Sequence, residues 1–324
     1  MIVRSVDGPR IVAHQNRGER DLFSEGMPGW HPGHKVMAMA GLLVTPQELV
    51  EAIQSDDPEA RPAVVDVRWQ LGQGTEANRA DYLAGHIPGA AFLDLETGLA
   101  GTPGTEGGGR HPMPSLTAAT EAFRAVGVRE ERPVVVYDNA SSLAAARAWW
   151  LLVYYGKDDV HVLDGGYAAW QEAGLEVQTG PCQNDWGDIV LTPGARRLLD
   201  AEAVEHYLDR HQVVDARPAE RFRGEREPVD PVAGHIPGAL SLPTLRTVDE
   251  HGRFLPSDDL ELLLTAAGVQ PDRRTAIYCG SGVQACHLAL AIEIAEHGHF
   301  DPAVYIGSWS DWTSDPDRPV ATGG

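Results

Sequence analysis

The sequence has few cysteines, no long apolar run and a shortage of positive charge, and each of these features excludes a class of protein. Three cysteines in 324 residues are too few for a disulfide framework, which predicts a reducing, cytoplasmic location. No apolar run approaches the ~18 residues that a membrane-spanning helix needs. With 26 basic and 47 acidic residues, the formal net charge of −21 argues against nucleic acid or a membrane surface as a partner.

The chain is long enough for two domains, and an internal repeat supports that number. Three landmarks recur in the same order at a spacing of about 145 residues, which is typical of duplicated domains rather than of a solenoid. They are residues 64–68 and 213–217, 84–90 and 233–239, and 163–170 and 305–312. We therefore predict an N-terminal extension (1–41), a first domain (42–180), a linker (181–196) and a second domain (197–324).

The extension and the two domains differ in their patterns. Residues 1–41 mix glycine, proline, histidine and charged residues without a period, which predicts a disordered or loosely docked segment. From residue 42 onward, short apolar segments such as 133–138 alternate with helix-forming segments such as 142–155. This alternation predicts an α/β fold in which each domain has a parallel sheet with helices on both faces.

One segment places a cysteine where a strand gives way to a helix. Cys279 follows the apolar run 276–278, and a helix is expected from Val283 to Ala295. Gly280 and Gly282 can adopt backbone conformations that turn successive N–H groups toward one point, where a negative charge is stabilised. The positive end of the following helix acts in the same sense, so Cys279 is a candidate nucleophile in its thiolate form. The candidate loop residues are Gly280, Ser281, Gly282, Val283, Gln284 and Ala285.

The first copy of the repeat has a different residue at the same place. Alignment of the strand ends puts Asp138 opposite Cys279, and the loop that follows Asp138 has no glycine. Asp138 and Ser141 are spaced as a helix N-cap arrangement, which is a structural role. We therefore expect the first domain to be unable to turn over a substrate by itself.

The sequence Cys-Gly-Ser-Gly-Val-Gln-Ala-Cys at 279–286 resembles the active-site loop of the rhodanese-type sulfurtransferases, and most closely the mercaptopyruvate sulfurtransferase variant. The resemblance extends from about residue 42 to the C-terminus. It implies two tandem rhodanese-like domains, of which only the second is catalytic. It also implies that Cys279 accepts sulfur from a small anionic donor, thiosulfate or 3-mercaptopyruvate, and passes it to a thiol or to cyanide. No cofactor is implied, because the cysteine itself carries the sulfur.

The resemblance also implies roles for other side chains. Arg221 matches the substrate arginine, whose planar fork suits a carboxylate or an oxyanion. His86 and Ser281 match members of a proton relay across the cleft between the domains. Two departures from the mercaptopyruvate pattern favour thiosulfate modestly as the donor. Ala77 stands where the acidic relay residue is expected, and Asp230 stands where a second arginine is expected.

Three alternatives to a sulfurtransferase are considered. Cysteine phosphatases bind phosphate with an arginine at the loop position that Ala285 occupies here, which argues against that class. Cys279, Cys286 and His287 offer too few ligands at too wide a spacing for a zinc site, so no metal is expected. A non-enzymatic sulfur carrier, binding or sensor module is the remaining alternative.

Overall fold

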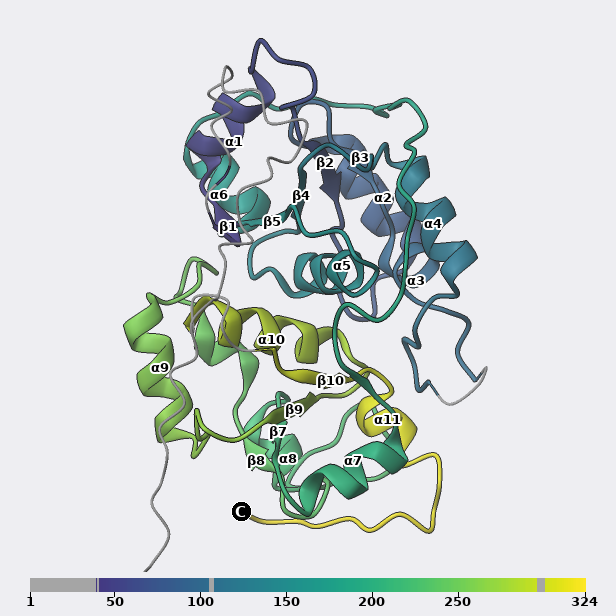
Figure 1. Ribbon diagram of the computed structural model, residues 1–324, viewed down its shortest axis with the longest axis vertical. Coiled ribbons are helices and arrows are strands. Elements are labelled where there is room, and N and C mark those ends of the chain that lie inside the picture. The colour runs from purple at the N-terminus through teal and green to yellow at the C-terminus, as the bar shows by residue number, and fades with distance from the viewer. Residues whose placement is uncertain (1–38, 40, 105–107, 296–300) are drawn as a thin grey trace, which may run out of the picture. The chain divides into compact units, whose positions relative to one another are not determined.

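The computed structural model describes residues 39, 41–104, 108–295 and 301–324, which contain two parallel five-stranded sheets (Figure 1). The extension predicted at 1–41 lies almost wholly outside the described residues. Each half of the chain contributes one sheet, and the order of the strands is the same in both. The predicted duplication and the predicted parallel α/β architecture are therefore confirmed.

The first sheet has the strand order β1-β5-β4-β2-β3. Its strands are β1 (Leu43–Val44), β2 (Ala63–Asp66), β3 (Ala91–Phe92), β4 (Val134–Tyr137) and β5 (Val160–Leu163). The helices of this half are α1 (Pro46–Ile53), α2 (Thr75–Ala84), α3 (Leu95–Gly98), α4 (Leu116–Ala125), α5 (Leu143–Tyr154) and α6 (Gly166–Glu172). Helix α1 begins with the capping box that Thr45 and Glu48 form.

The second sheet repeats this order as β6-β10-β9-β7-β8. Its strands are β6 (Leu198–Leu199), β7 (Gln212–Asp215), β8 (Leu240–Ser241), β9 (Thr275–Tyr278) and β10 (Ala303–Tyr305). The α-helices of this half are α7 (Ala201–Leu208), α8 (Ala219–Phe222), α9 (Ser257–Ala266), α10 (Val283–Ala295) and α11 (Ser308–Trp312), and the 3₁₀ helix η1 spans Thr244–Thr247.

The central strands are buried on both faces, as parallel sheets require. Along β4, Val134 and Val136 pack into one core while Val135 and Tyr137 pack into another, because successive side chains point to opposite faces. Strand β4 pairs with β2 in the same register as β9 pairs with β7. The residue that follows β4 and the residue that follows β9 therefore occupy equivalent positions.

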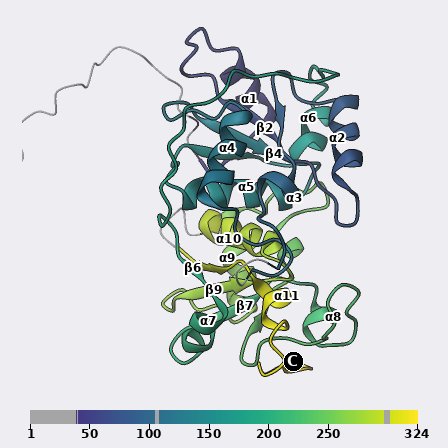
Figure 2. The ribbon, with the colours of Figure 1, turned by 90° about the vertical axis from the view of Figure 1, so that its right-hand side faces the viewer.

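Helices α5 and α10 form the main contact between the halves of the chain, and they lie between the two sheets (Figures 1 and 2). Residues of both helices belong to one hydrophobic core that also includes strand residues of both sheets. Helix α10 is buried almost all round, which is the pattern of a helix inside a protein core. Among the described residues, no helix is long and apolar enough to cross a membrane.

Candidate active site

Cys279 directly follows the central strand β9, and its side chain is buried. The N–H group of Gly282 donates a hydrogen bond to its Sγ atom at 3.1 Å. Gly282 has a φ angle of +88°, and a Cβ atom on it would lie 2.6 Å from the carbonyl oxygen of Ile306. The predicted special backbone of the loop is therefore found at Gly282, where a left-handed conformation and a close backbone contact both require glycine.

Gly280 is needed for a different reason, because its φ angle is not in the left-handed region. A Cβ atom at Gly280 would lie 3.0 Å from Nη2 of Arg110 and 3.5 Å from Nη1 of Arg221. The missing side chain thus leaves room for two guanidinium groups beside the cysteine loop. Arg110 belongs to the first half of the chain and Arg221 to the second.

In the first half, a carboxylate occupies the place of the cysteine. The side chain of Asp138 accepts hydrogen bonds from the N–H groups of Ala140, Ser142, Ala144 and Ala145 at 2.9–3.3 Å. Burial raises the pKa of Asp138, and these four donors counteract the rise. The contacts agree with the structural role expected of Asp138. They also show that this type of loop and helix start can hold a negative charge.

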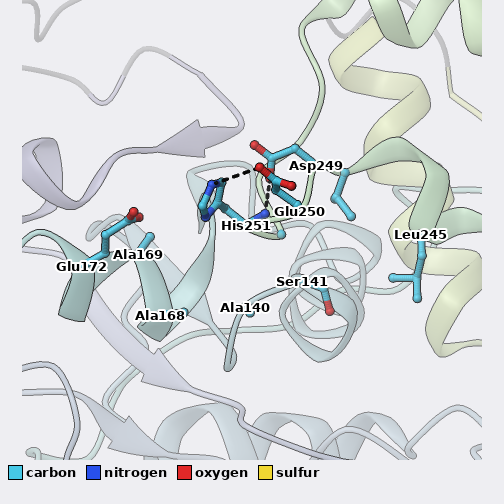
Figure 3. A pocket seen from close by; sticks show the side chains of 11 residues that line it. Ala140, Ser141, Ala168, Ala169, Glu172, Leu245, Asp249, Glu250 and His251 are labelled. Atoms are coloured by element: carbon cyan, nitrogen blue, oxygen red, sulfur yellow. Dashed lines mark hydrogen bonds and ion pairs between the residues drawn. The ribbon is translucent and has the colours of Figure 1, made fainter.

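A pocket of 590 Å³ adjoins this loop of the first half (Figure 3). Residues Ala140 and Ser141 lie on one side of it, and Leu245 and residues 248–252 of the second half lie on another. The carboxylates among its lining residues belong to Glu172, Asp249 and Glu250. Because the lining includes neither a cysteine nor an arginine, this pocket lacks both a sulfur nucleophile and an arginine to bind an anion.

Beside Cys279, the structure connects three polar side chains into a chain of hydrogen bonds. Ser281 Oγ lies 2.7 Å from Nδ1 of His111, and Nε2 of His111 lies 3.2 Å from Oε1 of Glu96. Burial lowers the pKa of His111, nearby Arg147 and Arg110 lower it further, and Glu96 opposes them. A neutral His111 that donates to Glu96 can accept the proton of Ser281, which is the arrangement of a general base.

The pairing of Ser281 with His86 is not found, so this prediction is wrong in its geometry. Nδ1 of His86 bonds the carbonyl oxygen of Tyr82 at 3.0 Å, and the ring stacks on Tyr82. His235 repeats this arrangement with Phe222 in the second half. In both halves the histidine thus bonds the carbonyl oxygen of a residue in the last turn of the preceding helix, which is a structural contact. The imidazole ring that contacts Ser281 belongs to His111 instead.

Arg221 lies beside the cysteine loop, as predicted, but two of its three guanidinium nitrogens already bind carboxylates. Its Nε and Nη2 atoms donate to the two carboxylate oxygens of Glu227 at 3.0 and 2.7 Å. Nη2 also lies 2.9 Å from Oδ2 of Asp230. These contacts lower the pKa of Glu227 against the effect of its burial. Two buried carboxylates therefore hold the Arg221 guanidinium in one orientation.

Arg147, on α5 of the first half, fixes the segment that carries His111. Its fully buried guanidinium donates to the carbonyl oxygens of Leu99, His111 and Pro112 at 3.1–3.3 Å. Its Nη1 atom has no hydrogen-bond partner among the described residues and lies 3.1 Å from the position of a Cβ atom on Gly282. Arg147 thus adds positive charge behind the cysteine loop.

Sequence reasoning missed Glu96, Arg110, His111 and Arg147 as site residues. A signal for His111 was present, because the glycine-rich insert before it occurs in the first copy of the repeat and not in the second. A segment that one copy alone carries is a candidate for function. Among the described residues, no group of three or more histidine, cysteine or acidic side chains could hold a metal ion.

The chain is similar to known proteins in sequence and in structure. The family described as Rhodanese-like domain matches residues 45–173 and 200–315. A Pseudomonas aeruginosa protein named a probable 3-mercaptopyruvate sulfurtransferase is 42% identical over 285 residues, which cover 87% of this chain and 98% of that protein. SseB of Mycobacterium tuberculosis, provisionally named a thiosulfate sulfurtransferase, is 40% identical over 293 residues, with coverage of 89% and 99%. The crystal structure of the Escherichia coli 3-mercaptopyruvate enzyme SseA matches with a TM-score of 0.72 at 32% identity, with coverage of 83% and 99%.

Proposed function

Because the chain belongs to the rhodanese-like family, we infer that it is a sulfurtransferase in which Cys279 carries the sulfur atom as a persulfide. Small sulfur donors and acceptors are its substrates. The assignment of Cys279 is supported by its place at the end of the central strand and by the N–H group of Gly282 on its sulfur. Asp138 in the equivalent position supports a single catalytic cysteine per chain.

The first step with 3-mercaptopyruvate requires a proton transfer. The Cys279 thiolate attacks the thiol sulfur of the donor, an S–S bond forms, the C–S bond breaks, and the electron pair goes to carbon as the enolate of pyruvate. The donor's S–H proton must leave and the enolate must be protonated. We propose that Ser281, whose Oγ lies 2.7 Å from Nδ1 of His111, moves this proton.

The first step with thiosulfate requires no proton transfer. The Cys279 thiolate attacks the outer sulfur, and sulfite leaves with the electron pair of the broken S–S bond. A relay would be of no use to this donor. We therefore propose that 3-mercaptopyruvate is the preferred donor, and the observation that carries this proposal is the hydrogen-bonded chain from Ser281 through His111 to Glu96.

This proposal replaces the modest preference for thiosulfate that the sequence suggested. That preference depended on two departures, an acidic relay residue that was not at its expected place and Asp230 in place of a second arginine. Glu96 supplies a carboxylate to His111 from a different position in the chain. The basis for favouring thiosulfate is weakened accordingly.

In the second step, a thiol or cyanide attacks the outer sulfur of the persulfide. The S–S bond breaks, the acceptor keeps the sulfur, and the Cys279 thiolate is restored. We propose this two-step cycle without a bound cofactor, because the cysteine carries the transferred group. A cytoplasmic location remains a prediction from the small number of cysteines.

The donor proposal is tested by replacing His111 and His86 with asparagine and measuring kcat/KM with both donors. His111→Asn should lower the value for 3-mercaptopyruvate about 100-fold or more, because general acid–base catalysis typically contributes that much. The value for thiosulfate should change by less than about tenfold, because its reaction moves no proton.

His86→Asn is the matched control, since asparagine retains an N–H donor for the carbonyl oxygen of Tyr82. It should affect the two donors equally. Equal losses for both donors in His111→Asn would contradict the relay, and so would a selective loss of 3-mercaptopyruvate activity in His86→Asn.

A further inference from the structure

We propose that Arg147, on α5 of the first half, is a positioning residue for the relay, because it fixes the segment of His111 against the cysteine loop. This inference rests on the proposed function, in which His111 is the base of the relay. The Arg147 side chain is fully buried, so a sulfur donor cannot reach it. Its contribution to the reaction therefore passes through the groups that it contacts.

On one side, the guanidinium of Arg147 binds the main chain around His111. Nη2 lies 3.1 Å from the carbonyl oxygen of His111 itself and 3.2 Å from that of Pro112. Nε and Nη2 also donate to the carbonyl oxygen of Leu99, at 3.3 and 3.2 Å. Leu99 and Pro112 flank the glycine-rich insert, and glycine loses more conformational freedom on folding than other residues do. One side chain thus ties the two ends of the insert together and fixes the backbone of His111.

On its other side, the guanidinium faces the cysteine loop. Nη1 has no hydrogen-bond partner among the described residues and lies 3.1 Å from the position of a Cβ atom on Gly282. The N–H group of Gly282 is the donor to Sγ of Cys279. Burial raises the pKa of the Cys286 thiol, and the charge of Arg147 opposes the rise, so the cation lies close to the start of α10. Arg147 therefore lies between the cysteine loop and the segment of His111, and it sets their separation.

The charge of Arg147 also acts on the His111 ring. Burial is the largest cause of the lowered pKa of His111, Glu96 opposes it, and Arg147 and Arg110 lower the pKa further. The Arg110 side chain is 31% exposed, whereas Arg147 is enclosed by protein, where charges interact more strongly than in water. Arg147 therefore favours the neutral ring that the relay requires. The uncharged side chains against the ring are those of Ser281 and Trp69.

A buried polar residue at the equivalent position of the second half provides a matched control. Arg147 is the fifth residue of α5, and His287 is the fifth residue of α10. The His287 ring is also fully buried, its Nδ1 lies 2.6 Å from Oγ1 of Thr244, and it stacks on Phe254. Burial lowers the pKa of His287 to about 4, so the ring is neutral near pH 7. His287→Gln should therefore perturb the packing of α10 without changing the charge near His111.

The test is the pH profile of kcat/KM with 3-mercaptopyruvate for Arg147→Gln, Arg147→Lys and His287→Gln. Without the positive charge the pKa of folded His111 should rise, so Arg147→Gln should move the acidic limb upward by about 0.5 pH unit or more. Arg147→Lys retains the charge, so its limb should stay at the wild-type pH. Both Arg147 variants should lower the plateau about tenfold, because neither side chain reproduces the planar fork of the guanidinium.

The same profiles with thiosulfate separate positioning of the relay from a general loss of structure. The thiosulfate value should fall by less than about threefold in either Arg147 variant, because its reaction moves no proton. His287→Gln should leave both the acidic limb and the ratio of the two donors at their wild-type values. If Arg147→Gln does not fold, the selective loss in Arg147→Lys decides the question.

Titration of the His111 ring by NMR provides a readout that does not depend on sulfur transfer. An unchanged titration in folded Arg147→Gln, or equal losses for both donors in Arg147→Lys, would make Arg147 a structural residue only and would overturn the proposal. If the wild-type protein transferred no sulfur, the proposed function would fail, whereas the titration would still report on the effect of Arg147 on His111.

Discussion

His111 is the proposed general base of the relay beside Cys279. Its ring lies between Ser281 and Glu96, and burial favours its neutral form by lowering its pKa. In that form Nε2 carries the proton that Glu96 accepts, and Nδ1 is free to accept from Ser281. The buried ring is thus held in the tautomer that a general base requires.

The pH dependence of the reaction should reflect this lowered pKa. As the pH falls through the pKa of folded His111, the ring gains a proton and can no longer accept one from Ser281. The rate with 3-mercaptopyruvate should therefore show an acidic limb below the ordinary histidine range. The rate with thiosulfate should lack that limb, and the measurement is kcat/KM for each donor across pH.

The Glu96→Gln variant tests in which direction the acidic limb of the pH profile moves. Glu96 raises the pKa of His111 through its charge and its hydrogen bond, so its removal should move the acidic limb to still lower pH. The plateau rate should change little, because the amide oxygen of glutamine can still accept the hydrogen bond from Nε2 of His111. A limb that moves to higher pH, or one that is equal for both donors, would be evidence against His111 as the base.

Ser308, the first residue of α11, has a strained backbone conformation and bonds the backbone of Cys279. Ser308 has a φ angle of +56°, and its Oγ accepts a hydrogen bond from the N–H group of Cys279 at 3.0 Å and donates one to the carbonyl oxygen of Tyr305 at 2.8 Å. The equivalent residue of the first half is Gly166, with the same φ angle. Serine in this conformation costs of order 1–3 kcal/mol, and its hydroxyl is a reason for that cost to persist.

The Ser308→Gly variant distinguishes the effect of the backbone strain at Ser308 from the effect of its hydroxyl group. The variant should differ little from wild type in urea unfolding, because the strain that glycine relieves is offset by the loss of the two hydrogen bonds of the Ser308 hydroxyl. Its kcat/KM should fall about tenfold for both donors, because the backbone of Cys279 loses a hydrogen bond. Ser308→Ala, which loses the hydroxyl and keeps the strain, should be less stable than Ser308→Gly. Full activity in Ser308→Gly would mean that the hydroxyl has no role in positioning the cysteine.

The regular elements could be predicted from the sequence more completely than the loops could. Helix α10 begins at Val283, the residue predicted for its start, because the strand before it and the glycines between them mark that start locally. The pairing of His111 with Ser281 has no such local cause. These residues are 170 positions apart, and their contact depends on how α5 and α10 pack the two halves together. The family resemblance predicted a relay histidine but assigned the role to His86. The structure shows that His86 instead bonds the carbonyl oxygen of Tyr82.

The two halves form one core, and the site is completed where they meet. Buried residues from both sheets and from α5 and α10 belong to the same hydrophobic cluster. The first half has Asp138 at the position equivalent to Cys279, but its His111 and Arg110 lie beside the cysteine loop of the second half. A second half without this partner would lack the proposed relay base and would expose the apolar surface of α10.

Cys279 alone is expected to carry the transferred sulfur. Cys286 provides the internal control, because its complete burial raises the pKa of its thiol to about 12 and leaves it an unreactive thiol. The decisive measurement is the intact mass of the protein after treatment with 3-mercaptopyruvate without an acceptor, followed by peptide mapping. Wild type and Cys286→Ser should each gain one sulfur atom on Cys279, and Cys279→Ser should gain none. Sulfur mapped to Cys286, or gained by Cys279→Ser, would contradict the assignment of Cys279 as the sulfur carrier.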